Sequence, residues 1–167
     1  AYAPVGDPRE VEATTARAKL LFNPAGLRDL TTKLTFNHFG STAPQNESLN
    51  PQPHPTNPRH DPRRAVFKSN MNSTIWDLAW EASDALTFEN RVIYTDFNIN
   101  RPTAYNIQYA EIDGQEVHVE PVVRFGGADS RLHGLAGLRY FHGTQDEFVN
   151  IFGGSTFKDK TDTHSAF

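Results

Sequence analysis

Chemically active side chains gather in the segment from Tyr109 to Glu120, which reads YAEIDGQEVHVE. His118 and Glu120 are two residues apart, so in a strand they share one face. An imidazole beside a carboxylate is suited to acid–base catalysis or to metal ligation. The candidate catalytic residues are therefore His118, Glu120, Glu111, Glu116 and Tyr109.

Asp113-Gly114, in the middle of this segment, predicts a tight hairpin turn. A type I′ turn needs positive φ at both central residues, and this dipeptide tolerates it. The flanking strands, 104–112 and 115–125, would place Glu111 directly opposite Glu116. Two facing glutamates repel each other unless solvent, a cation or protonation relieves them. The favoured interpretation is the solvated face of an antiparallel sheet, and a reactive site is the alternative.

Histidines spread along the chain raise the question of a metal site. Four of the seven lie on or beside expected strands. Two or three of these could converge with a carboxylate, and two histidines with one carboxylate form a set that binds iron. The candidate metal ligands are His38, His118, Glu120, His133 and His142. Their spacing matches no metal motif, so a divalent metal ion is the less favoured interpretation and the cofactor stays undetermined.

Composition excludes several kinds of chemistry. The chain has no cysteine, which rules out disulfides, thiolate nucleophiles and zinc–thiolate sites. It contains no G-x-S-x-G, and the glycine-rich stretch 125–134 is neither a P-loop nor a dinucleotide motif. The net charge of −4 argues against a general nucleic-acid binder. A local basic cluster that could contact nucleic acid is formed by Arg59, Arg63, Arg64 and Lys68.

The elements that would position these residues indicate a β-rich α+β domain. We expect an antiparallel sheet, sandwich or partial barrel with one amphipathic helix against it. The helix is predicted over 73–86, where Ile75, Leu78 and Ala82 recur at i, i+3 and i+7. A second helix is compatible with 9–22.

Alternation of apolar and polar residues predicts a strand over 27–39, with Leu30, Leu34 and Phe36 on one face. Shorter strand patterns occur at 65–68, 91–97 and 135–142. The segment 145–152 fits a short helix or strand, and 158–167 is a polar tail. All 167 residues are expected to form a single domain.

Six of the eleven prolines fall between Asn37 and Arg63. They are Pro44, Pro51, Pro53, Pro55, Pro58 and Pro62. Proline removes a backbone donor and restricts the residue before it. The segment 37–63 is therefore expected to be an extended arm or loop, which could become ordered on a neighbouring subunit.

These features favour a structural or self-assembling subunit, of virion or particle type, whose arm contacts identical or other protein subunits. The alternative is a small enzyme or ligand-binding domain with the His118/Glu120 site on the open face of its sheet; the sequence does not decide whether the protein is an enzyme. No apolar run approaches the roughly 20 residues that span a bilayer, and AYAPVGDPRE is not a signal peptide. A soluble chain is expected whether or not a leader was removed. The sequence does not decide its compartment, for which a virion and the outside of the cell are the candidates.

Overall fold

The computed structural model describes residues 11–27, 29–44, 66–102, 108–128, 130–150 and 154–167. All regular structure in these residues is β-strand. The first four strands are β1 (Glu12–Phe22), β2 (Leu30–Pro44), β3 (Val66–Ser83) and β4 (Leu86–Pro102). The last three are β5 (Gln108–Phe125), β6 (Gly134–Val149) and β7 (Ser155–Ala166).

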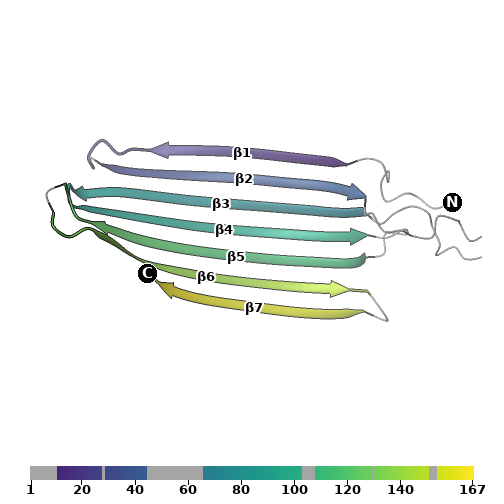
Figure 1. Cartoon of the computed structure of the whole chain (residues 1–167). Helices are drawn as coiled ribbons and strands as arrows, with labels where there is room; N and C mark the ends of the chain where they lie inside the picture. The colour runs from purple at the N-terminus through teal and green to yellow at the C-terminus, as the bar shows by residue number, and fades with distance from the viewer. Residues whose placement is uncertain (1–10, 28, 45–65, 103–107, 129, 151–153) are drawn as a thin grey trace, which may run out of the picture.

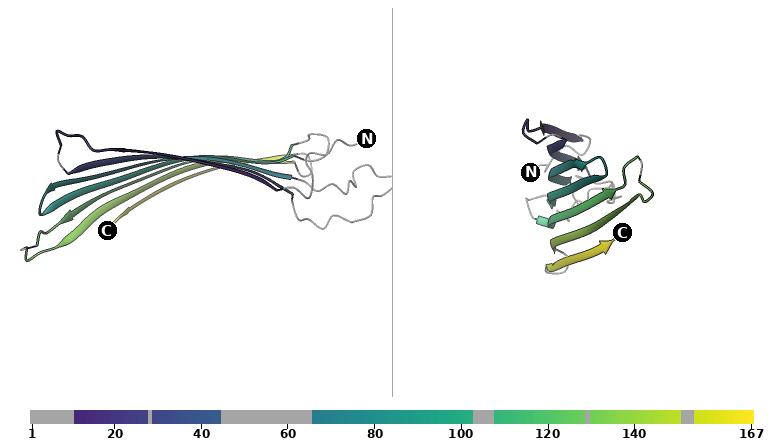
Figure 2. Two further views of the ribbon diagram at one scale, coloured as in Figure 1. Left: turned by 90° about the horizontal axis from the view of Figure 1, so that it is seen from above. Right: turned by 90° about the vertical axis from the view of Figure 1, so that its left-hand side faces the viewer.

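The seven strands form one antiparallel sheet in chain order, so each strand pairs with its neighbours in sequence (Figure 1). Seen from the side, the sheet is a single twisted layer (Figure 2). The prediction of a β-rich antiparallel sheet is confirmed. The sheet is open and single across the described residues, which is one of the three expected arrangements; the sandwich and the partial barrel are not formed there. The described residues contain no helix, so the expected α+β class is replaced by an all-β fold. β1 and β7 are its two edges.

The predicted helix over 73–86 is wrong, because this segment forms most of β3, the connection Asp84–Ala85 and the start of β4. Trp76, Leu78 and Trp80 follow a period of two, although Ile75, Leu78 and Ala82 follow the helical period. Pairing of β3 with strands on both sides decides for the strand. The region 9–22 forms β1 from Glu12 onward and is not a helix either.

The predicted turn at Asp113-Gly114 is also wrong. Both residues lie within β5, where Asp113 pairs with Asn98 and Gly114 with Phe97 of β4. The ring of Phe97 occupies the space that a Cβ on residue 114 would need. Glycine is therefore favoured by the neighbouring ring, which a larger residue would have to displace, and not by a turn.

Other segments follow the sequence patterns more closely. The strand predicted over 27–39 corresponds to β2, which starts at Leu30 and continues to Pro44. Residues 37–44, assigned to the arm, thus belong to a strand, and the rest of the arm lies outside the described residues. The polar tail forms most of the edge strand β7. Polar residues suit these strands because the described residues bury neither face of the sheet.

Alternation gives the sheet two unlike faces, since directly paired residues point to the same side. One side, here named the tryptophan face, carries the row Leu34, Trp76, Val92, Val119 and Tyr140. The opposite side, the ion-pair face, carries the adjacent row Lys33, Asp77, Arg91 and Glu120.

Very little of this sheet is buried. Thr35, at 2% exposure, is the only buried residue apart from two glycines among the described residues. Folded domains usually bury a sheet face against a second layer. Both faces here are open over the described residues, which include no helix that could cross a membrane.

Candidate functional site

The predicted catalytic residues are divided between the two faces. Glu116, His118 and Glu120 alternate along β5 and share the ion-pair face. Glu111 points to the opposite face and pairs with Asn100, so it does not meet Glu116, which pairs with Thr95. Tyr109 belongs to β5, but its side chain lies outside the described residues.

His118 and Glu120 each have partners of their own. The His118 ring lies 4.6 Å from the ring of Phe141, and its Nε2 is 3.7 Å from Glu116 Oε2. Arg139 Nε donates to Glu120 Oε2 at 2.9 Å. Glu120 is thus engaged with a guanidinium rather than with the imidazole. The strand alternation correctly placed His118 and Glu120 on one face together with Glu116. Phe141 and Arg139 come from β6, and local sequence does not reveal these contacts.

The candidate metal ligands do not converge. On the tryptophan face, His38 Nδ1 of β2 lies 2.8 Å from Asn72 Oδ1. On the same face, His142 Nδ1 of β6 lies 2.7 Å from Asp162 Oδ1 of β7. His133 lies in the connection before β6. The described residues contain no group of three or more histidine and acidic side chains that could hold a metal ion.

The best-developed polar arrangement is a ladder of charges on the ion-pair face. Asp77 of β3 binds Lys33 of β2 at 2.8 Å and Arg91 of β4 at 2.6 Å. Glu120 of β5 follows and binds Arg139 of β6. Charges therefore alternate in sign across five neighbouring strands. The first four of them, on β2 to β5, line a shallow hollow of about 500 Å³. The ladder ties the strands together and keeps this face polar.

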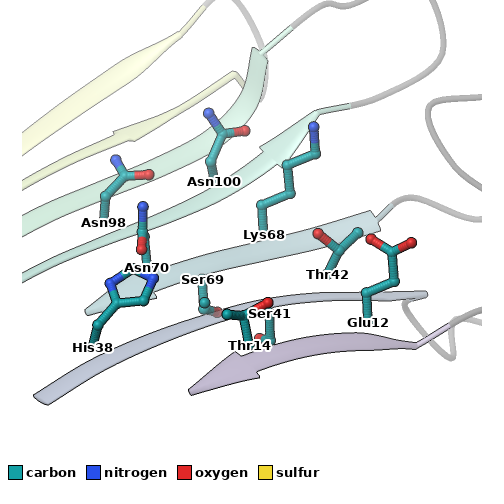
Figure 3. Close-up of a pocket in the computed structure, with 11 residues that line it drawn as sticks. Glu12, Thr14, His38, Ser41, Thr42, Lys68, Ser69, Asn70, Asn98 and Asn100 are labelled. Carbon is teal, nitrogen blue, oxygen red and sulfur yellow. The ribbon is translucent and has the colours of Figure 1, made fainter. Parts of the chain in front are cut away.

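A second polar hollow, of about 450 Å³, lies over β1 to β4 at the other end of the strands (Figure 3). Its lining includes His38, Lys68, Asn70, Asn98 and Asn100. Asn98 Nδ2 donates to Asp113 Oδ1 at 2.7 Å, while the buried Asn100 Oδ1 has no hydrogen-bond partner among the described residues. Amides and hydroxyls suit polar ligands, and Lys68 is the member of the predicted basic cluster that the structure describes.

Sequence reasoning missed both hollows. The polar hollow has a visible signal, because asparagines two residues apart in a strand share a face, as at Asn98 and Asn100. The charge ladder has no comparable signal. Lys33, Asp77 and Arg91 are far apart in the chain and meet only through the register of three strands.

One further side-chain cluster lies at the β6–β7 edge. Asp162 accepts a hydrogen bond from the Tyr140 hydroxyl at 3.4 Å besides its contact with His142, and Lys160 Nζ lies 3.8 Å away. The hydrogen bond with His142 holds the pKa of Asp162 below its usual value, although desolvation opposes this shift.

The chain matches no known protein family model and no solved structure.

Proposed function

We propose that this protein is a structural, self-assembling β-subunit whose sheet is completed by further strands at its β1 and β7 edges. The observation that carries the proposal is a seven-stranded sheet whose two edges and two faces are left open by the part of the chain that the structure describes. The partner is a strand that runs antiparallel to the edge, supplied by a second copy or by another protein segment.

Burial supports this proposal. Ordering a residue's backbone costs about 1–2 kcal/mol, and apolar burial is the main term that offsets it. In β1, Leu20 and Phe22 remain 65% and 59% exposed, and every residue of β1 and β7 is exposed. A partner would supply the missing contacts at both edges.

The edges differ in how open they are to pairing. An unpaired strand presents free N–H and C=O groups that attract another strand, and charged side chains discourage such pairing. β7 carries Lys158, Asp159, Lys160 and Asp162 close together. β1 carries three more widely spaced charges, at Glu12, Arg17 and Lys19, and ends in the apolar run Leu20–Phe22. β1 is therefore the more open of the two edges.

The alternative of a His118/Glu120 active site has less support. Glu120 is engaged with Arg139, and His118 lies on an open face, where its side chain is 40% exposed. Neither residue is held in a desolvated cleft of the kind that tunes catalytic groups.

Amide hydrogen exchange tests the proposal. The chain is studied over a range of concentrations, with and without other proteins from its source. We expect the amides of β1 to gain protection as assemblies form. A folded monomer in which β2 to β6 are protected while β1 and β7 exchange freely under all conditions would contradict the proposal.

A further inference from the structure

The tryptophan face carries an apolar band that the edge pairing does not explain. Its central row joins six strands through Leu20, Leu34, Trp76, Val92, Val119 and Tyr140. The next row on one side contains Phe36, Tyr94 and Val117. On the other side, Leu30, Trp80 and Phe88 line an apolar hollow of about 440 Å³ together with Leu27 and Leu78.

The band carries no formal charge. On β1 to β6, no Asp, Glu, Lys or Arg occupies the tryptophan face between the level of Leu86 and the level of Tyr94. At the same level, the ion-pair face carries the whole charge ladder. Leu34, Trp76 and Trp80 of the band are 45%, 42% and 44% exposed. Such a large uncharged patch marks an interaction surface.

The height of the band is well defined. On β4 it covers the nine residues from Leu86 to Tyr94, which is about 26 Å at the usual rise of a strand. The hydrocarbon layer of a bilayer is about 30 Å thick, and a strand of roughly nine to eleven residues matches it. Aromatic residues stand near both limits of the band, with Phe125 and Phe88 at one and Tyr94 at the other. Tyrosine is favoured where hydrocarbon meets water.

Beyond the band, the same face becomes polar. The next row contains Asn72, Asp96 and Gln115, and the row after it contains Asn70, Asn98 and Asp113. A second copy stacked on this face in the same direction would bring Asp96 and Asp113 against their own equivalents. A copy stacked in the opposite direction, about an axis at the level of the band, would cover band with band and leave both polar halves outside the contact. Charge repulsion therefore disfavours a second sheet in the same direction. The height of the band and the aromatic residues at its limits favour a hydrocarbon layer with water at its border, and the test below distinguishes this layer from a second sheet in the opposite direction.

We infer that the apolar band contacts lipid acyl chains, while the ion-pair face stays hydrated. Hydrocarbon cannot satisfy the free backbone groups of β1 and β7. The lipid contact therefore requires the edge pairing proposed above, although it concerns a different surface.

The two tryptophans of the chain, Trp76 and Trp80, allow a direct test because both lie in the band. The chain is reconstituted with phosphatidylcholine vesicles whose acyl chains carry bromine, and with unbrominated vesicles as the reference. We expect brominated lipid to quench most of the tryptophan fluorescence.

Two neighbouring substitutions provide a matched pair. Val92→Arg places a charge at the centre of the band, whereas Ile93→Arg places it on the ion-pair face of the same strand. We expect Val92→Arg to lower vesicle association at least about thirtyfold and Ile93→Arg to leave it nearly unchanged.

Absence of bromine quenching in the unsubstituted chain, or an equal loss in both variants, would overturn the inference. A discrete lipid-free dimer that shields both tryptophans from acrylamide would also overturn it, in favour of a second sheet. Hydrogen exchange at β1 and β7 in the same vesicles reports on the edge pairing separately, so failure of one proposal is distinguishable from failure of the other.

Discussion

Gly114 illustrates how a single residue can be placed by a neighbour that the local sequence does not reveal. The ring of Phe97 on the paired strand covers the position where a side chain would start. Asp-Gly is a common turn signal. Here, however, the glycine of β5 makes room for the Phe97 ring of the adjacent strand β4. The residue type was informative, but the reason for it lies in β4.

Gly114→Ala should destabilise the sheet by roughly 1–3 kcal/mol, because the new methyl group must displace the Phe97 ring. Gly40→Ala is the control, since its Cβ would meet its nearest atom, His38 Nε2, at 3.6 Å. The control substitution should leave the free energy of unfolding unchanged or raise it slightly. Urea denaturation measures both variants, and equal free energies of unfolding would show that the ring is readily moved.

Asp162 gives a prediction about pH. Its pKa is lowered chiefly by the hydrogen bond with His142. A carboxyl group with a lowered pKa stabilises the fold above its unfolded pKa, and this contribution disappears as the pH falls through its folded pKa. His142→Ala should therefore raise the pKa of Asp162 towards its usual value and reduce the loss of stability in acid.

An NMR titration of the Asp162 carboxyl group measures this shift. Lys160→Ala is the control, because Lys160 lies farther from Asp162, at 3.8 Å. Lys160 also lowers the pKa of Asp162 less than His142 does. The larger pKa change should follow loss of His142. A larger change in the lysine variant would contradict the assignment.

At the scale of elements, β2 and β3 show what the sequence can and cannot reveal. Over Leu30–Phe36, alternation is clear and the strand prediction was confirmed. Around Trp76–Trp80, apolar residues satisfy the strand period and the helical period at once. Only the register with β2 and β4 decides between them. The charge ladder depends on that same register, so the mistaken helix also concealed the best-developed polar arrangement.

The charge ladder predicts which ion pairs between strands contribute more to the stability of the sheet. Asp77→Ala removes two ion pairs that join β2, β3 and β4. This substitution should lower the free energy of unfolding by about 1 kcal/mol. Asp146→Ala removes one highly exposed ion pair with Lys158. It should lower the free energy of unfolding much less than Asp77→Ala does. Urea denaturation at low and high salt tests this order. The difference should shrink in 1 M salt because screening weakens exposed pairs, and equal effects at low salt would argue against the ladder.

At the scale of the whole molecule, the odd number of strands limits how copies can join. In a seven-stranded antiparallel meander, β1 and β7 run in the same direction. Copies joined from β7 to β1 with the same orientation would pair in parallel. A pair of β1 strands related by a two-fold axis would be antiparallel and would continue the pattern of the sheet.

This geometry leads to a prediction for assemblies made only of this chain. Because the chain has no cysteine, a single introduced cysteine reports only its own contacts. Disulfide formation needs Cα atoms within about 7 Å. In a β1–β1 pair, residues near the two-fold axis meet their own equivalents. Among Thr14→Cys, Arg17→Cys and Leu20→Cys, one variant should therefore cross-link most efficiently, and the others should decline with distance from it.

Thr95→Cys serves as the control, because Thr95 lies on the central strand β4 and is already paired on both sides. It should give no comparable dimer. Efficient cross-linking only between one cysteine in β1 and another in β7 would instead indicate head-to-tail joining. No β1 cross-link in any single variant, despite an assembly of defined size, would mean that the β1 edge is completed by a strand other than its own equivalent.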